Sequence, residues 1–217
     1  MKSSLQEKLN KLLNAYSHLY DIERDVMVEG QFFPAAATYY LRDENYLISR
    51  KHVLSAVEQH EYVHFHLTGH LDAREPQSLI DITRRDGLKR VQPSKEHMFS
   101  YITLIVLADT IDSEAVRLIR KTRFRKNYLL TLHGWTEYHL AALETSSNRF
   151  YSNPAGRGAR KILESNFLSR DRRIKSPVQK KTKGVTENMN GLVLLIISIA
   201  ILLCGYIFYG RYLCKKW

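Results

Sequence analysis

The sequence predicts an α+β protein: a single domain with a mostly antiparallel sheet covered by helices, plus one C-terminal transmembrane helix. Three observations predict it. Apolar runs with strand periodicity alternate with amphipathic helical segments through residues 1–168. That length suffices for one domain with a hydrophobic core and is too short for two to be expected. Residues 191–210 then form an apolar run without a single charge.

The first 70 residues are expected to begin with a helix and to continue as strands. Leu5, Leu9 and Leu12 recur at helical spacing, which predicts an amphipathic helix over about residues 3–20 that covers one face of the sheet. A location on the membrane surface is the alternative for this helix. Residues 25–70 predict successive strands, with hairpin turns at the polar tetrapeptides 42–45 and 58–61.

A helix is expected after these strands. Asp72 and Glu75 form a capping pattern, and Pro76 falls in the first turn. The helix should continue to about Arg85 and end near Gly87.

A long strand follows. Residues 97–109 are nearly all apolar, which predicts a central strand buried on both faces. Asp112 is the expected N-cap of the next helix, whose last turn is basic and so suits the helix dipole. The remaining elements are two strands within residues 127–145 with a turn near Gly134, a tight connection within residues 146–152, and a helix capped by Asn153.

The apolar run of residues 191–210 has the length of a membrane span. A helix of about 20 residues extends about 30 Å, which is the thickness of a bilayer's hydrocarbon core. A buried core helix is the alternative, but apolar side chains on every face leave no polar side for water. We therefore expect a single-pass, tail-anchored protein of the cell membrane.

The flanking charges predict the orientation of this span. Residues 169–190 form a polybasic linker, and residues 211–217 form a short tail with three basic residues. The positive-inside rule then places residues 1–168 in the cytoplasm and the tail outside it. The linker either rests on anionic lipid headgroups or is simply solvated. Its basic residues are Arg170, Arg172, Arg173, Lys175, Lys180, Lys181 and Lys183.

Net charge does not favour nucleic acid as a partner. The linker contributes +5 and the tail +3 of the net charge of +11, which leaves +3 for the domain. The basic segment from Arg117 to Lys126 permits binding to nucleic acid or to an anionic membrane surface, but a cationic helix end followed by a solvated loop is favoured. Both cysteines, Cys204 and Cys214, belong to the anchor region, so the domain has no thiol chemistry.

Three histidines raise the question of a metal site. His64, His66 and His70 alternate along one predicted strand and therefore share a face. Neighbouring positions on that face lie about 7 Å apart, which is poorly suited to three ligands that each lie about 2 Å from one ion. A solvent-facing or edge strand is favoured, and neither a metal nor another cofactor is expected.

No complete catalytic motif occurs in the sequence. An enzyme would have to use His97, Asp109 or His133 in a cleft, and a deep pocket where these side chains converge would favour that alternative. A flat or ridged apolar patch would favour a binding module. Gly156 and Gly158 offer N–H groups at a helix start for a phosphate, but the Lys-Ser/Thr of a P-loop is missing.

Several short motifs resemble a known family. They are Glu96-His97, Ala-Asp-Thr-Ile-Asp at 108–112, Leu-His-Gly-Trp at 132–135 and Asn-Pro-Ala-Gly at 153–156. Over most of residues 20–160, the chain resembles an uncharacterised bacterial family, a domain of unknown function found in anaerobic Gram-positive bacteria. The resemblance implies a membrane tail and a domain without catalytic hallmarks. It implies no activity, cofactor or catalytic residue, and the pair His64 and His66 is not typical of it.

The sequence thus favours a binding or scaffolding module at the inner membrane face. Tethering raises the effective concentration of such a module near other membrane components. A protein partner is expected, with Trp135 and Tyr138 as anchors if they are exposed, although a core position is favoured for Trp135. The alternative is a membrane-tethered enzyme that acts on a lipid or a phosphorylated small molecule.

Overall fold

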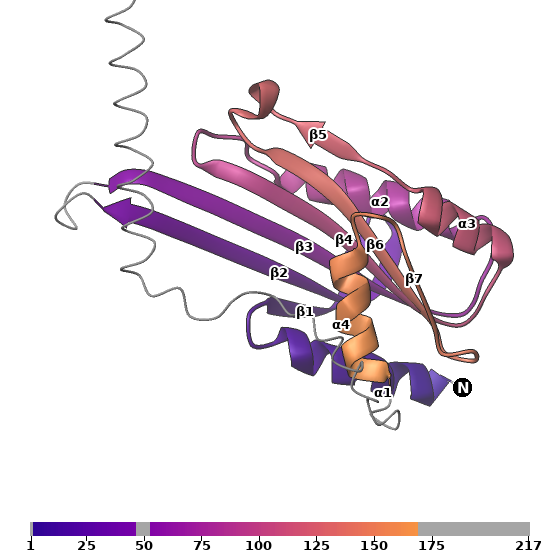
Figure 1. The fold of residues 1–217 in the computed structure, drawn as a ribbon. Coiled ribbons are helices and arrows are strands. Elements are labelled where there is room, and N and C mark those ends of the chain that lie inside the picture. The colour runs from indigo at the N-terminus through magenta and orange to yellow at the C-terminus, as the bar shows by residue number, and fades with distance from the viewer. Residues whose placement is uncertain (1, 47–52, 169–217) are drawn as a thin grey trace, which may run out of the picture. The chain divides into compact units, whose positions relative to one another are not determined.

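The computed structural model describes residues 2–46 and 53–168 (Figure 1). Together they form one unit of the chain. The predicted linker, membrane span and tail lie outside the described residues. Within residues 2–46 and 53–168, no helix is long and apolar enough to cross a membrane.

The domain is built on one seven-stranded sheet with the order β1-β2-β3-β4-β6-β5, in which β7 also pairs with β6. The pairings β3–β4 and β4–β6 are parallel, whereas the four others are antiparallel, so the sheet is mixed. The strands are β1 (Asp21–Val28), β2 (Gln31–Tyr46), β3 (Val53–Leu71), β4 (His97–Ile111), β5 (Arg125–Asn127), β6 (Trp135–Glu144) and β7 (Arg149–Ser152).

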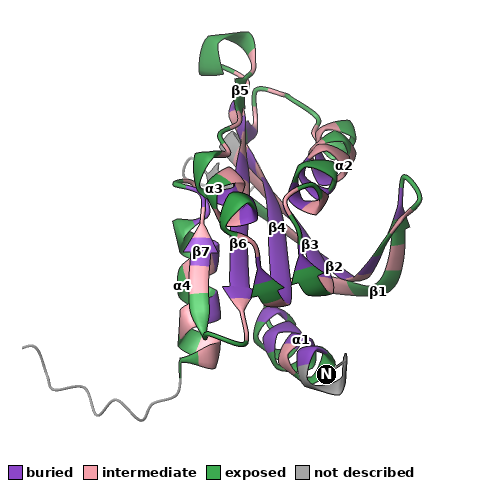
Figure 2. Cartoon of the chain, turned by 90° about the vertical axis from the view of Figure 1, so that its right-hand side faces the viewer, coloured by how far each residue is buried: buried purple, intermediate pink, exposed green. Residues whose placement is uncertain are grey.

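Helices cover both faces of this sheet (Figures 1 and 2). The helices α2 and α3 pack on one face, where Leu79 and Ile119 join the core around Ile102. The helices α1 and α4 pack on the other, where Leu9 and Leu163 join the core around Ile105, Leu107 and Ala141. The described helices are α1 (Lys2–Tyr16), α2 (Glu75–Arg90), α3 (Ser113–Lys121) and α4 (Arg157–Phe167).

The parallel centre follows from the chain order. The helix α2 connects β3 to β4, and α3 lies between β4 and β6. Such crossovers return the chain to the same end of the sheet, which makes successive strands parallel. A single domain that combines a sheet with helices is therefore confirmed. The predicted central strand is also confirmed, because β4 lies between β3 and β6 and is buried along most of its length.

Both predicted hairpin turns are wrong. Residues 42–45 lie inside β2 and residues 58–61 lie inside β3, and Arg42 pairs with Glu58 across the ladder. Their guanidinium and carboxylate are 2.8 Å apart. A cross-strand charge pair therefore accounts for the first residue of each polar stretch that suggested a turn. The turn that connects β1 to β2 is formed by Glu29 and Gly30, which both have positive φ.

Helix boundaries also differ from prediction. The first helix ends at Tyr16, and α2 runs through Gly87 to Arg90. Gly87 is not a terminator: a Cβ at this position would lie 2.5 Å from Cγ1 of Ile102. Glycine permits close packing of α2 on β4 here. The capping role of Asp72 is confirmed, since its carboxylate accepts the N–H groups of Arg74 and Glu75.

The last third of the domain contains three further differences. The predicted strand before Gly134 is mostly a 3-10 turn, η1 (Leu129–Thr131), and the predicted connection within residues 146–152 includes β7. Asn153 lies before α4 but does not cap it, because Gly156 is the N-cap residue and no side-chain hydrogen bond caps this helix. The Asn153 amide oxygen instead accepts the N–H groups of Leu140 and Gly156, which ties this connection to β6.

Candidate functional site

The α1/α4 face of the sheet is only partly covered. At the carboxyl ends of β4 and β6, side chains such as Leu107 and Leu143 are fully buried beneath these helices. Toward the amino ends the side chains on this face are only partly buried, and β2 and β3 extend beyond the helices (Figure 1). We call this region the open face. It consists of Tyr20, Tyr39, Glu61, Phe99, Tyr101, Trp135, Glu137 and His139.

Aromatic rings form the surface of the open face. The Phe99 and Tyr101 rings stack with centroids 4.4 Å apart, and Tyr101 lies 4.3 Å from the His139 ring. The Trp135 ring lies 5.8 Å from Phe99, and the Arg125 guanidinium lies over the indole at 4.9 Å. Alternation along β4 and β6 therefore produces a continuous π surface that already holds one cation.

Two carboxylates lie within this aromatic surface. Glu61 accepts hydrogen bonds from the Tyr20 and Thr103 hydroxyls, each at 2.6 Å. Glu137 lies 3.8 Å from Nε2 of His139. Burial lowers the pKa of His139 more than Glu61 and Glu137 raise it. At neutral pH this imidazole is therefore uncharged and does not neutralise the two carboxylates.

The phenol groups of Tyr20 and Tyr101 stay protonated. Burial and the nearby Glu61 carboxylate raise the pKa of Tyr20, whose hydroxyl donates a hydrogen bond to that carboxylate. Burial, followed by the charges of Glu137 and Glu61, raises the pKa of Tyr101. The open face is therefore aromatic and acidic, with Arg125 as its cation.

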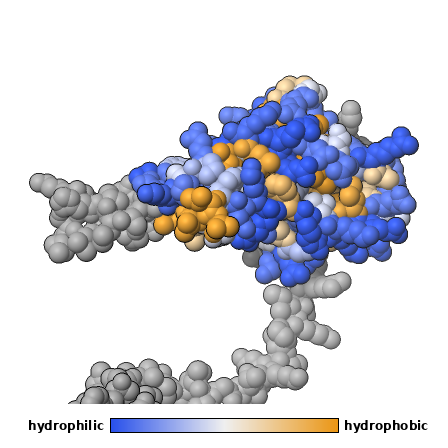
Figure 3. All heavy atoms as spheres, turned by 90° about the horizontal axis from the view of Figure 1, so that it is seen from above, coloured by the Kyte–Doolittle hydropathy of each residue, from blue (hydrophilic) through white to orange (hydrophobic). Residues whose placement is uncertain are grey.

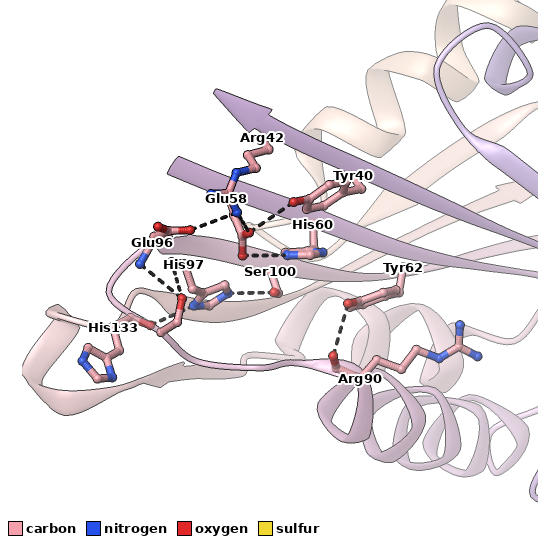
Figure 4. A network of polar contacts seen from close by, with 11 residues as sticks. Tyr40, Arg42, Glu58, His60, Tyr62, Arg90, Glu96, His97, Ser100 and His133 are labelled. Carbon is pink, nitrogen blue, oxygen red and sulfur yellow. Dashed lines mark hydrogen bonds and ion pairs between the residues drawn. The ribbon is translucent and has the colours of Figure 1, made fainter. Parts of the chain in front are cut away.

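A second polar cluster lies on the opposite face of the sheet (Figure 4). Arg42 binds the carboxylates of Glu58 and Glu96 at 2.8 and 3.0 Å, and the Tyr40 hydroxyl donates to Glu58. Next to it, His97 is buried, and its Nδ1 lies 2.8 Å from the backbone carbonyl of His133. A carbonyl can only accept, so Nδ1 donates this hydrogen bond.

The proposed catalytic residues His97, Asp109 and His133 do not converge. His97 lies at the start of β4 and Asp109 near its end, twelve residues away, which corresponds to about 40 Å along a strand. Asp109 accepts a hydrogen bond from the Thr145 hydroxyl. Figure 4 shows the His133 ring turned away from His97. A pocket of about 300 Å³ lies between α1, the start of β2 and the end of β3, and none of the three residues lines it.

The three histidines His64, His66 and His70 lie on β3. The sequence favoured a solvent-facing or edge strand for them, and this interpretation is wrong. β3 lies between β2 and β4, and His64 and His66 are buried. Nε2 of His64 binds Asp86 at 3.1 Å, and Nε2 of His66 binds Glu75 at 2.8 Å. His70 is exposed. In the described part of the chain, no group of three or more His, Cys, Asp or Glu side chains could hold a metal ion.

The two aromatic residues expected to anchor a partner and the glycine considered for phosphate binding lie in different environments. Tyr138 is fully buried, and its hydroxyl lies 2.7 Å from that of Thr83, so it cannot serve as an interface anchor. Trp135 is only half-buried and belongs to the open face, which corrects the favoured core position. Gly156 is buried against the Leu140 backbone, and Asn153 already accepts its N–H, so a phosphate has no access there.

The basic segment from Arg117 to Lys126 spans the end of α3 and most of β5. Arg120 lies over the Tyr151 ring, Arg125 over Trp135 and Lys126 over Tyr128. The three side chains of β5 are exposed.

Sequence reasoning missed most of the open face. A sequence pattern for this face does exist, because its aromatic and polar residues recur at every second position of two strands. They are Phe99 and Tyr101 on β4, and Trp135, Glu137 and His139 on β6. That pattern does not reveal which half of a strand a helix leaves uncovered.

Fold and surface together define a three-layer domain with one partly uncovered aromatic sheet face. A family model described as a domain of unknown function (DUF8052) matches residues 4–165, so the chain belongs to this family. The expected relationship to a family of unknown function is thereby confirmed, while the bacterial group from which it comes stays a prediction. No curated protein and no solved structure matches the chain.

Proposed function

We propose that this protein is a membrane-anchored binding module that recognises a protein partner through the open face. The observation that carries the proposal is the row of half-buried rings on β4 and β6, which no described helix covers. Half-buried aromatic side chains supply large contact areas at protein interfaces. The open face differs from the purely apolar patch expected of a binding module because it also carries two carboxylates, but its half-buried rings support the same function.

The chemistry of the open face favours a basic partner segment. Glu61 and Glu137 carry two negative charges against the single charge of Arg125, because His139 is neutral. The stack of Arg125 on Trp135 shows that this surface accommodates a guanidinium group. Lysine or arginine side chains of a partner would meet both carboxylates and ring faces there.

The membrane part of the proposal is supported by the sequence alone. Residues 191–210 have the length and composition of a membrane span, and the basic residues before them favour a cytoplasmic domain. The folded domain would then act at the inner membrane face, where tethering compensates for modest affinity.

Crosslinking in cells tests the binding function. A photoreactive phenylalanine in place of Tyr101 should crosslink to one recurrent protein, through a peptide that contains lysine or arginine. The same group at Met27, which is exposed on the β1–β2 hairpin, is the matched control and should give no such product. Trp135→Ala and Glu137→Gln should each reduce the yield severalfold. Equal yields at both positions, or a yield that these variants leave unchanged, would refute the open face as the binding site.

The same crosslinking experiment also tests the alternative that the protein is an enzyme. Asp109→Asn and His133→Gln alter none of the open-face residues and should leave the crosslink intact. If no partner is captured and these two variants make a specific lipid or phosphorylated metabolite accumulate, a membrane-tethered enzyme explains the protein better.

A further inference from the structure

The segment between β5 and β6 projects three leucines into solvent. Leu129, Leu130 and Leu132 are 62%, 92% and 72% exposed. We call residues 128–134 the leucine loop. Figure 3 shows a compact apolar patch among hydrophilic side chains on the side of the domain where this loop lies. Burying leucine normally stabilises a protein by about 1.5–3 kcal/mol, so three exposed leucines in one loop require an explanation.

The leucines are held outward by a specific backbone conformation. Leu129, Leu130 and Thr131 all have positive φ, at 44°, 52° and 75°. Left-handed backbone at non-glycine residues is unfavourable and persists only where the surroundings enforce it.

Hydrogen bonds enforce this conformation from the base of the loop. The N–H of Tyr128 donates to the carbonyl of Gly134, and the N–H of His133 donates to that of Tyr128. The buried ring of His97 holds the carbonyl of His133. The exposed leucines are therefore presented by an ordered loop.

Basic side chains precede the leucine loop along the chain: Lys126 lies over the Tyr128 ring at its start, and the Arg123 guanidinium donates to the carbonyls of Arg120 and Thr122 at the end of α3. Arg123, Arg125 and Lys126 precede it and are exposed. No acidic residue occurs in the sequence between Arg117 and Glu137. An apolar tip next to exposed cations is complementary to an anionic lipid surface, since leucine enters the acyl boundary while basic groups stay at the phosphates.

We infer that the leucine loop inserts into the interfacial region of an anionic membrane. Leu129, Leu130 and Leu132 would enter about 5–10 Å below the headgroups, with Arg123 and Lys126 at the phosphates. The inference goes beyond the proposed function, because it gives the folded domain its own contact with lipid and would orient the open face relative to the bilayer.

A fluorescent probe on the full chain tests this contact. With Cys204 and Cys214 changed to Ser, Leu130→Cys carries an environment-sensitive dye, and the protein is reconstituted in vesicles of phosphatidylcholine with phosphatidylglycerol. The emission should shift to the blue, and nitroxide-labelled lipids should quench it severalfold more than the same dye at Met27→Cys. Arg123→Gln with Lys126→Gln, or vesicles of phosphatidylcholine alone, should weaken the quenching.

Other outcomes overturn the inference. If the chain floats with vesicles but the dye at Leu130 is quenched no more than the dye at Met27, the loop contact is wrong while the anchor stands. If quenching is equal in anionic and neutral vesicles, the role of the basic residues is wrong. If the chain does not associate with vesicles at all, both the anchor and the loop contact fail. If a photoreactive group at Leu130 crosslinks in cells to one protein instead of lipid, the loop belongs to a protein interface.

Discussion

At the residue scale, His97 and His133 are in contact, but only the side chain of His97 takes part; His133 contributes its backbone carbonyl. His97 is buried, with Nδ1 bound to the carbonyl of His133 and Nε2 2.8 Å from the Ser100 hydroxyl. The ring of His133 does not take part in this contact. The pair is therefore a structural support for the leucine loop.

Alanine variants separate this role from catalysis. His97→Ala leaves the partly buried carbonyl of His133 and the buried Ser100 hydroxyl without their partner and creates a cavity, so it should reduce the free energy of unfolding by about 2–4 kcal/mol. His133→Ala keeps the carbonyl and should stay within about 0.5 kcal/mol of the parent. Urea unfolding measures both. Similar losses for the two variants would contradict the contact through the backbone.

Asp86 provides a second test at this scale, through pH. Burial alone would raise the pKa of this carboxyl, but the hydrogen bond from His64 and the charge of Arg90 outweigh burial and hold the pKa below its ordinary value of 3.8. A carboxyl whose pKa is lowered by folding contributes stability above the unfolded pKa and loses it as pH falls through the folded pKa.

Asp86→Asn should therefore reduce the free energy of unfolding by about 1–3 kcal/mol at pH 7, and the difference should shrink below pH 3.8. Urea unfolding across the acid range measures it. Glu7→Gln, a change of an exposed carboxylate on α1, is the control and should have little effect. A difference between Asp86→Asn and the parent that stays constant down to the lowest pH would exclude the proposed ion pairing.

At the scale of elements, two helical glycines predict opposite effects of the same substitution. Gly87 in α2 lies against Ile102 of β4, whereas a Cβ at Gly158 in α4 would meet no atom within 4 Å. Alanine favours helix over glycine by about 1 kcal/mol where space permits. At Gly87 the added methyl group has no room, so overpacking should outweigh that gain.

Gly87→Ala should destabilise the protein by about 1–3 kcal/mol, and Gly158→Ala should stabilise it by about 0.5–1 kcal/mol. Thermal unfolding of both variants measures the difference. In an Ile102→Ala background the penalty at Gly87 should disappear, because that change removes the atoms in conflict. A stabilising Gly87→Ala in the parent would show that α2 does not pack closely on β4.

At the scale of the whole molecule, the folded domain should be independent of the C-terminal segments. Both hydrophobic cores lie between Leu5 and Leu163, and residues 1–169 form one unit. A fragment of residues 1–168 should be soluble and unfold in a single cooperative transition, with the same amide-exchange protection in β4 as the full chain in detergent. If the fragment misfolds while the full chain folds, the tail is part of the core.

The sequence by itself determined the features that depend on neighbours along the chain. The apolar run 97–109 identified the central strand, Asp72 identified a cap, and helical spacing together with capping patterns indicated where the four described helices lie. These patterns suffice because helix and strand periodicity, capping and burial on both faces are local properties. The short motifs near His97 and Trp135 were also enough to indicate a family of unknown function.

Only the tertiary structure decided which residues meet. It placed residues 42–45 and 58–61 within paired strands, buried His64 and His66 beneath α2, joined the His97 ring to the backbone carbonyl of His133 and paired β4 with β6 in parallel. It also left the amino ends of β4 and β6 uncovered, which creates the open face. The physical reason is that strand pairing and helix coverage join residues far apart in sequence, and polar stretches form turns or solvated strands depending on those distant partners.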